Sequence, residues 1–291
     1  MSSLAAETRN ILRAHGLHPR KGLGQNFLID REALESVVRA AELGPNDLVL
    51  EIGPGVGTLT EALAACGAPV VAVELDEGLA AVLRTRMALR NNVRVVPGNA
   101  LHLDPAALIP PGRPFKVVAN IPYHITAPLI RHFLAGTMRP TMMVLMVQKE
   151  VAERLTAAPG RLSVLGLSAQ FYARTEIVRV VPASSFFPPP QVDSAIVRLR
   201  VYATPPVAVD DEARFFKLIK AGFGETRKQL HNALTQGLAH IPARQIDAAL
   251  AGASIDRTRR AETLSLAEWS ALYEALKSKP VATAPALETN D

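Results

Sequence analysis

Short apolar runs with the composition of β-strands alternate with helical stretches along most of the chain, and this alternation constrains the fold more than any other feature. Strand-like runs occupy residues 48–52, 70–75, 93–96, 116–120 and 142–147. Helical stretches near residues 58–66, 77–90 and 128–135 separate several of them. Parallel pairing needs such crossovers, which are almost always right-handed, so the sequence predicts an α/β sheet covered by helices on both faces.

The pattern changes beyond residue 160. A helix is predicted over residues 161–173, and two further strands over 175–181 and 192–200. Only the proline-rich segment PASSFFPPPQ joins these two strands, and no helix fits in so short a link. The two strands are therefore expected to be antiparallel neighbours. A Rossmann-like sheet of seven strands with the last strand antiparallel is typical of class I methyltransferases, whereas ordinary dinucleotide-binding folds usually lack that strand.

The remaining part of the chain predicts a second domain. We place a first, sheet-containing domain at residues 1–202 and a small, all-helical accessory domain at residues 203–280, which begins with the linker ATPPVAVDD. Residues 281–291 have the composition of a disordered tail. The helical stretches expected in the second domain are residues 212–223, 226–238, 243–253 and 266–276.

A glycine-rich turn, from Glu51 to Gly57, follows the first predicted strand and opens a helix. Glycines let the backbone approach a ligand, and the free N–H groups at a helix start favour an anion. That anion could be the carboxylate of a methionine moiety or the pyrophosphate of a nicotinamide dinucleotide, and a tight turn with no ligand is a further possibility. Glu74 ends the next strand, where an acidic side chain can accept hydrogen bonds from ribose hydroxyls. Asn99 follows the third strand and could meet an adenine edge or serve only as a turn residue.

A second polar turn, Asn120-Ile-Pro-Tyr123, follows the fourth strand at the carboxyl edge of the sheet, where ligands bind. The Asn120 side-chain carbonyl can hold a hydrogen of an adenine amine, and Pro122 brings no competing N–H donor. Tyr123 can stack on the base, and Phe186 with Phe187 offers a second stacking face before a stiff proline run. The alternative interpretations are a turn without chemistry and phenylalanines that merely cover the end of the sheet.

Composition narrows the class of protein further. The single cysteine, Cys66, allows no internal disulfide and is expected to be buried, and the scattered histidines have no metal-site spacing. No apolar run has the length of a signal peptide or a membrane span, so a cytoplasmic protein is expected. The net charge is +5, and the chain from Pro206 onward carries equal numbers of basic and acidic residues. The basic excess therefore lies earlier, where it suits either a polyanionic partner or a solvated surface.

The sequence resembles the bacterial 16S ribosomal RNA adenine dimethyltransferases (the KsgA/RsmA family) from about Lys21 to about Trp269. The motifs that carry the resemblance are LGQNFL (23–28), LEIGPGVGTLT (50–60), VELD (73–76), ANIPYHI (119–125), QKEVAERL (148–155), GRLSVL (160–165), FFPPPQVDSAIVRL (186–199) and RAETLS (260–265).

This resemblance implies S-adenosylmethionine as the cofactor. It also implies which residues bind each ligand. The cofactor-binding residues would be Asn26, Leu28, Gly53, Glu74, Asn99 and Asn120. The residues that hold the target adenine would be Asn120, Tyr123 and Phe186. The implied substrate is two adjacent adenosines near the 3′ end of 16S rRNA, within an immature small subunit, and the protein would act as a monomer without metal or membrane.

Two departures from the family pattern and three rival functions remain. The family usually carries Asp at the position of Asn99, and a more basic run before the pair Arg227-Lys228. One rival is the related antibiotic-resistance methyltransferase of large-subunit rRNA, against which the segments 148–150 and 160–163 speak. The others are a non-catalytic assembly or transcription factor on the same fold, and a nicotinamide oxidoreductase, which would leave Asn-Ile-Pro-Tyr unexplained.

Overall fold

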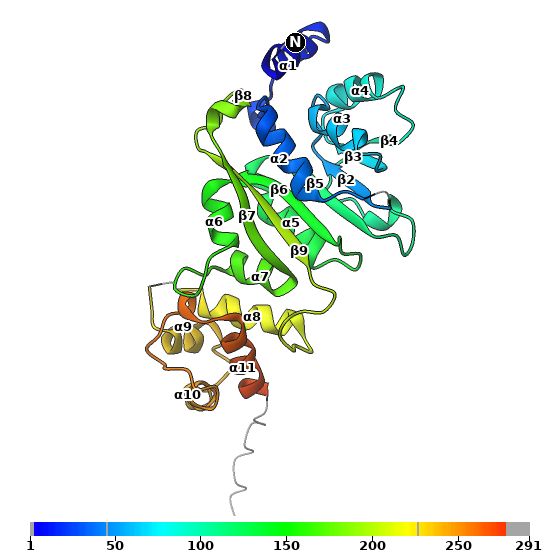
Figure 1. The fold of residues 1–291 in the computed structure, drawn as a ribbon. Helices are drawn as coiled ribbons and strands as arrows, with labels where there is room; N and C mark the ends of the chain where they lie inside the picture. Colours follow the sequence, from blue (N-terminus) through cyan, green and yellow to red (C-terminus); the bar gives the residue numbers. More distant parts are fainter. Residues whose placement is uncertain (1–2, 45, 226, 278–291) are drawn as a thin grey trace, which may run out of the picture. The chain divides into compact units, whose positions relative to one another are not determined.

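The computed structural model describes residues 3–44, 46–225 and 227–277, which form two compact units (Figure 1). The first unit comprises Met1–Thr156 with Tyr172–Pro205, and the second comprises Ala157–Phe171 with Pro206–Asp291. The second unit thus includes a segment that the sequence analysis placed in the first domain. The predicted domain boundary at residue 202 stays a prediction, and the predicted tail at 281–291 lies outside the described residues.

A seven-stranded sheet forms the centre of the first unit, in the order β4-β3-β2-β5-β6-β9-β7. The pairs from β4 through β6 are parallel, whereas β9 is antiparallel to both of its neighbours. This confirms the predicted seven-stranded sheet with an antiparallel last strand. The strands are β2 (Leu48–Ile52), β3 (Val70–Glu74), β4 (Val93–Pro97), β5 (Phe115–Asn120), β6 (Met142–Gln148), β7 (Ala173–Val181) and β9 (Ser194–Val201).

Helices connect and cover these strands. The strands advance across the sheet in one direction from β2 to β4 and in the other from β5 to β7. Right-handed crossovers therefore place α3 and α4 on the face opposite to α5 and α6. Three helices were not predicted, namely α1, α2 and α6. The helices of this unit are α1 (Leu4–Ala14), α2 (Arg31–Ala41), α3 (Thr58–Ala65), α4 (Glu77–Arg86), α5 (Thr126–Leu134) and α6 (Lys149–Leu155).

The sheet is buried under apolar side chains from both α2 and α3. Val37 of α2 and Leu63 of α3 pack in one cluster with Val49 of β2 and Val118 of β5, and all four are almost completely buried. Parallel strands that are buried on both faces have continuous apolar sequences, so their positions could be predicted from the sequence. Cys66 was expected to be buried, and this prediction was wrong. It is exposed, because α3 ends at Ala65 and the chain turns there into solvent.

A short second sheet joins segments that are far apart in the chain. Strand β1 (Phe27–Leu28) pairs antiparallel with β8 (Phe186–Phe187), so that Leu28 lies opposite Phe186. This pairing could not be predicted from the sequence, since each strand has only two residues. The chain also forms short 3₁₀ helices, namely η1 (Lys21–Leu23), η2 (Pro105–Ala107), η3 (Tyr123–Ile125), η4 (Ala183–Ser185) and η5 (Ala261–Thr263).

The second unit is helical, as the sequence predicts for this part of the chain. Trp269 is fully buried and stacks on Phe223, and a Cβ atom on Gly222 would approach its ring to 2.4 Å. The helices of the second unit are α7 (Val164–Tyr172), α8 (Glu212–Gly222), α9 (Leu230–Gly237), α10 (Ala243–Gly252) and α11 (Leu266–Lys277). Of α7, the residues up to Phe171 belong to this unit. Across the described residues of both units, no helix is both long and apolar enough to span a bilayer.

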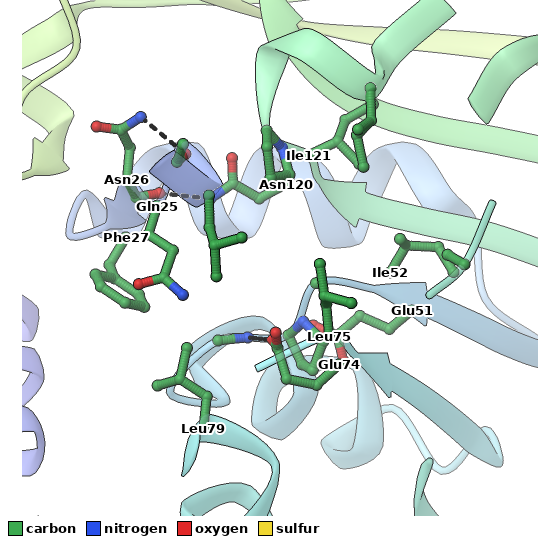
Figure 2. Close-up of a pocket in the computed structure, with 18 of the residues that line it drawn as sticks. Gln25, Asn26, Phe27, Glu51, Ile52, Glu74, Leu75, Leu79, Asn120 and Ile121 are labelled. Atoms are coloured by element: carbon green, nitrogen blue, oxygen red, sulfur yellow. Dashed lines mark hydrogen bonds between the residues drawn. The ribbon is translucent and has the colours of Figure 1, made fainter. Parts of the chain in front are cut away.

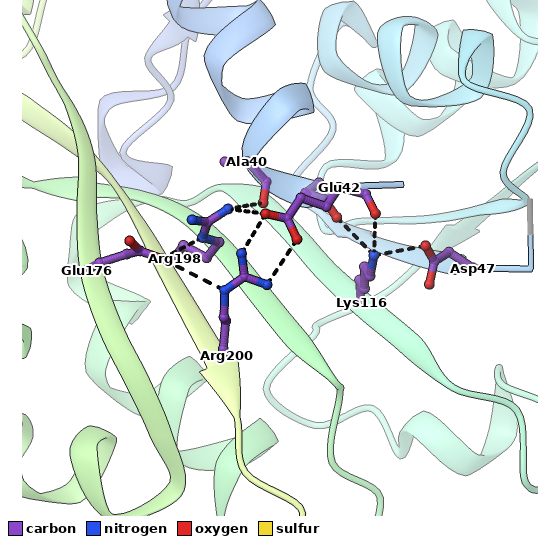
Figure 3. Close-up of polar contacts among 8 residues, drawn as sticks. Ala40, Glu42, Asp47, Lys116, Glu176, Arg198 and Arg200 are labelled. Atoms are coloured by element: carbon purple, nitrogen blue, oxygen red, sulfur yellow. Dashed lines mark hydrogen bonds and ion pairs between the residues drawn. The ribbon is translucent and has the colours of Figure 1, made fainter. Parts of the chain in front are cut away.

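A cluster of charged residues closes the carboxyl end of α2 (Figure 3). The Lys116 ammonium donates to the carbonyl oxygens of Ala41 and Glu42, at 3.0 and 2.6 Å, and to the Asp47 carboxylate at 2.8 Å. Burial tends to raise the pKa of Asp47, but the hydrogen bonds from Lys116 and from the Gly44 N–H, together with the charge of Lys116, outweigh burial and leave this pKa below its usual value. Because carbonyls at a helix end lack partners within the helix, Lys116 caps α2 and fixes it to β5.

Replacing Lys116 with methionine is expected to destabilise the protein by about 2–4 kcal/mol, because Asp47 and two helix-end carbonyls lose their buried partner. Urea unfolding measures the change. The matched control is Lys149→Met, since Lys149 is half exposed and its carboxylate partner, Glu153, lies 4.0 Å away. That control should change stability by less than about 0.5 kcal/mol. Equal effects of the two substitutions would contradict the capping role of Lys116.

Candidate active site

A cavity of about 230 Å³ lies at the carboxyl ends of β2, β3, β4 and β5 (Figure 2). In parallel α/β sheets this edge is where ligands bind, because loops and helix starts converge there. The structure brings every residue that the family resemblance assigns to the cofactor or the target adenine to the wall of this one cavity. These residues are Asn26, Leu28, Gly53, Glu74, Asn99, Asn120, Tyr123 and Phe186.

The glycine turn between β2 and α3 forms the floor of the cavity. Gly53 has a φ of 67°, in the left-handed region that favours glycine, and its N–H donates to the carbonyl of Val73. Gly57 is the N-cap residue that precedes α3 and has a φ of 90°, and a Cβ atom there would lie 2.4 Å from the Leu83 side chain. Both positions therefore require glycine, and the residues of this turn line the cavity.

Glu74 is held by the backbone on two sides. One carboxylate oxygen accepts the N–H of Gly55 at 2.9 Å and the other accepts the N–H of Asp76 at 2.9 Å. The side chain is only 6% exposed, and burial raises its pKa, with a smaller contribution from the charge of Asp76. Each oxygen keeps a lone pair for a further donor. Glu74 is thus fixed as an acceptor for hydroxyl groups of a ligand in the cavity.

Glu51 is a second buried carboxyl in the cavity wall, and the sequence analysis gave it no role. It is 1% exposed, and neither of its oxygens has a hydrogen-bond partner among the described residues. Burial raises its pKa to about 8, the charge of Glu74 adds to this shift, and the nearby Thr60 hydroxyl opposes it. A buried carboxyl without a partner is costly when ionised, so a cationic group in the cavity would be its natural partner.

Replacing Glu51 with glutamine is expected to stabilise the cofactor-free protein, increasingly so as pH rises from 4.5 to about 8. The pKa is higher in the folded than in the unfolded protein, so the wild type loses stability across this window because the carboxyl ionises in the unfolded chain while the folded protein keeps it protonated. The full difference is on the order of 5 kcal/mol, at about 1.4 kcal/mol for each pH unit. Urea unfolding of both proteins near pH 5 and above pH 8 measures it. Parallel stability profiles would contradict a buried, unpartnered Glu51.

The Asn120 amide is oriented by the N-terminal segment. Its Nδ2 donates to the backbone carbonyl of Asn26 at 3.0 Å, and the Asn26 side chain in turn donates to the carbonyl of Gly24 at 3.2 Å (Figure 2). With Nδ2 engaged, the Asn120 Oδ1 atom has no donor among the described residues. Asn120 therefore presents a carbonyl oxygen as a hydrogen-bond acceptor at the end of β5.

The same N-terminal segment is anchored beside the cofactor loop. Asp76, which is buried, caps the start of α4, accepts from the Gln25 side chain at 3.3 Å and pairs with Arg20 at 3.2 Å. Phe27 lies against the glycine turn, because a Cβ atom on Gly55 would meet its ring at 3.0 Å. Residues 20–28 thus cover the cavity and fix the position of Asn26.

Tyr123 and Phe186 contribute aromatic rings to the cavity from different elements. Tyr123 begins η3, directly after the turn, and its hydroxyl hydrogen-bonds to Ser194 at 2.8 Å. Phe186 lies on β8, opposite Leu28, and is almost completely buried. Phe187 does not line the cavity, and Arg9 instead lies over its ring at 4.9 Å from the centroid. A second stacking face can therefore involve Phe186 but not Phe187.

Asn99 and Leu75 form the part of the wall that follows β3 and β4. The Asn99 Oδ1 atom accepts the N–H of Leu101 at 3.0 Å, so this residue also makes the turn that the sequence left as an alternative. Leu75 was missed by the sequence analysis, although it is 53% exposed, which is unusual for leucine. The position of Leu75 directly after Glu74, at the end of β3, was the one sequence signal that could have placed it in the cavity wall. Among the described residues there is no cluster of metal-ligating side chains.

The antiparallel strand β9 between β6 and β7, together with this cavity, defines the class: the protein is a class I methyltransferase. Enzymes of this class that act on rRNA adenines take their methyl group from S-adenosylmethionine, which confirms the predicted donor. The sequence matches the ribosomal RNA adenine dimethylase family over residues 16–278, and the chain belongs to that family.

Relatives and solved structures agree with this assignment. Proteins named ribosomal RNA small subunit methyltransferase A include one from Dehalococcoides mccartyi, 44% identical over 96% of this chain and 95% of its own length. Another, from Moorella thermoacetica, is 42% identical over 95% of this chain and 100% of its own. The crystal structure of 23S rRNA methyltransferase ErmE is 32% identical with a TM-score of 0.70, covering 87% of this chain and 100% of that one. A dimethyladenosine transferase from Plasmodium falciparum is 27% identical with a TM-score of 0.73, covering 84% and 95%.

Proposed function

We propose that the protein dimethylates the N6 amines of two adjacent adenosines near the 3′ end of 16S rRNA. Its substrate is an immature small ribosomal subunit, and it acts as a monomer in the cytoplasm. The observation that carries the chemistry is the orientation of Asn120, whose Nδ2 is bonded to the Asn26 carbonyl so that its Oδ1 can accept from the substrate amine. The names of the relatives support the choice of rRNA.

The adenine amine is a poor nucleophile, because its lone pair is delocalised into the ring. Holding both amine hydrogens turns that lone pair out of conjugation and toward the methyl donor. Asn120 Oδ1 accepts one hydrogen, and a backbone carbonyl of the turn accepts the other. Pro122 has no N–H that would compete for these acceptors. No strong base is needed, so the rate depends mainly on positioning.

The cavity residues fit S-adenosylmethionine. Glu74 would accept the two ribose hydroxyls, and the unpartnered Glu51 carboxyl would face the cationic methionine ammonium. Gly53 would let the backbone approach the methionine moiety, while Asn99, Leu28 and Leu75 would surround the adenine. The bound cofactor supplies an electrophilic methyl group on a positively charged sulfur.

The pocket would also accept a monomethylated amine. After one transfer a single amine hydrogen remains, so one acceptor must give way to a methyl group. The Asn120 side chain can rotate and the neighbouring Ile121 is apolar and buried, whereas a backbone carbonyl cannot easily move. Tyr123 and Phe186 would keep the base in plane during the second transfer. The end product would therefore be dimethyladenosine.

The RNA would be held partly by basic residues that precede Pro206. Several of them already have carboxylate partners; for example, Arg154 pairs with Glu150 and Arg179 pairs with Glu32. Exposed pairs of this kind are weak and can exchange for phosphate. Binding would weaken as salt rises, and single-stranded features of the RNA would select the site.

A methyl-transfer assay tests this function against its rivals. Isotope-labelled S-adenosylmethionine is given to the enzyme with immature small subunits, with large subunits and with duplex DNA. Label should enter small-subunit RNA by far the fastest. Preference for large subunits would instead favour the rival activity on large-subunit RNA; one of the similar structures is the 23S rRNA methyltransferase ErmE. No transfer to any substrate would favour a non-catalytic assembly or transcription factor.

A further inference from the structure

Ser194 is a buried polar residue at the start of a strand that is otherwise apolar over its first half. It begins β9, opposite Gln148 of β6 and Val181 of β7, and its side chain is 0% exposed. The residues that follow it, Ala195, Ile196 and Val197, are buried as well. A hydroxyl in such surroundings needs a hydrogen-bond partner, because its burial is otherwise unfavourable by several kcal/mol.

The partner of Ser194 is Tyr123, which lies 71 residues earlier in the chain, in the turn that follows β5. The two hydroxyl oxygens are 2.8 Å apart, and no other described residue bonds to the Tyr123 hydroxyl. Burial raises the pKa of Tyr123, the bond from Ser194 acts against this shift, and the charge of Asp193 reinforces it. The phenol therefore stays protonated at neutral pH and can donate or accept in this bond.

We propose that Ser194 is a positioning residue for methyl transfer, which holds the Tyr123 ring in the orientation that stacks on the target adenine. This inference rests on the proposed function, in which Tyr123 contacts the base. It also gives a chemical role to β9, the antiparallel strand that distinguishes this fold, because β9 supplies the anchor for an aromatic ring of the substrate pocket.

The geometry of the bond determines what it can fix. The phenol oxygen lies on the axis about which a tyrosine ring flips, so a hydrogen bond to it restrains the direction of that axis and leaves ring flips free. Tyr123 is only partly buried, so packing alone does not fix its side chain. Without the bond to Ser194 it can adopt other χ1 rotamers, which would move its ring away from the base. The second transfer should suffer most, because the monomethylated amine has one hydrogen fewer to hold and depends more on stacking.

The test compares Ser194→Ala, Tyr123→Phe and the double variant. Single-turnover rates of the first and second methylation are measured on immature small subunits, and the affinity for S-adenosylmethionine is measured by calorimetry. Each single variant should slow the second transfer about tenfold, with cofactor affinity within about twofold of the wild type. The double variant should be no slower than either single variant, because all three lack the same bond.

The matched control is Ser36→Ala, which also removes a buried serine hydroxyl, one that donates to the carbonyl of Glu32 within its own helix at 2.7 Å. This control should leave both rates unchanged. If Ser194→Ala does not fold, Ser194→Cys gives the same comparison, because a thiol is a similar size but a weak hydrogen-bond partner.

Two results would overturn the inference. One is unchanged second transfer in the Ser194 variant, and the other is additive losses in the double variant, which would mean that the Tyr123 hydroxyl acts independently of Ser194. Both can be seen only if the wild type makes dimethyladenosine in small-subunit RNA. A wild type that makes none would overturn the proposed function itself, so the two failures are distinguishable.

Discussion

Replacing Asn120 with alanine is expected to lower the rate of methyl transfer by about 10²–10³-fold. The substitution removes the acceptor that holds one amine hydrogen, while the backbone turn and Pro122 remain. Asn120→Asp should not restore activity, although it keeps acceptor oxygens. A carboxylate cannot donate to the Asn26 carbonyl, whose oxygen would instead face a negative charge. Single-turnover kinetics at saturating cofactor measure both variants.

The control for this pair is Asn91→Ala, since Asn91 is exposed and follows α4 outside the cavity. It should transfer methyl groups at the wild-type rate. An Asn120→Ala enzyme that stays within about threefold of the wild type would show that the amine is not held by this side chain. An active Asn120→Asp enzyme would show that the bond to Asn26 does not orient it.

Replacing Glu74 with alanine is expected to weaken the binding of S-adenosylmethionine at least about 100-fold. Hydrogen bonds to a charged acceptor contribute about 1.5–3 kcal/mol each, and two to the ribose would be lost. The structure adds a second cause, because the N–H groups of Gly55 and Asp76 lose their common acceptor and the glycine turn is released. Calorimetry measures the affinity directly.

Glu77→Ala is the matched control, since Glu77 lies three residues further on, at the exposed start of α4. It should bind the cofactor as the wild type does. Equal affinity of the Glu74→Ala protein would remove Glu74 from the cofactor site. The outcome also bears on fold stability, so the variant's unfolding transition should be recorded beside its affinity.

The sheet could be predicted from the sequence because its strands carry their own signal. Residues 48–52, 70–75 and 116–120 are apolar runs of strand length bounded by turns, as expected for strands buried on both faces. The insertion of β9 between β6 and β7 could not be predicted, because strand order depends on pairing partners distant in sequence. The strands β1 and β8 were missed because each has only two residues, too few for a strand pattern in the sequence.

The candidate site was predicted as a set of residues but not as a structure. The motifs around Glu74 and Asn120 placed both at the carboxyl edge of the sheet, and both line the cavity. Their local partners escaped prediction, since the bond from Asn120 to Asn26 joins residues 94 positions apart. The unpartnered state of Glu51 also depends on burial by other segments, which no local pattern reveals.

Nucleoside mass spectrometry of small-subunit RNA, during a time course with the wild-type enzyme and S-adenosylmethionine, tests the proposed dimethylation most directly. We predict that N6-methyladenosine rises first and is then converted to N6,N6-dimethyladenosine, until each RNA molecule carries two dimethylated residues. A reaction that stops at monomethyladenosine, or dimethyladenosine that accumulates in large-subunit RNA instead, would contradict it.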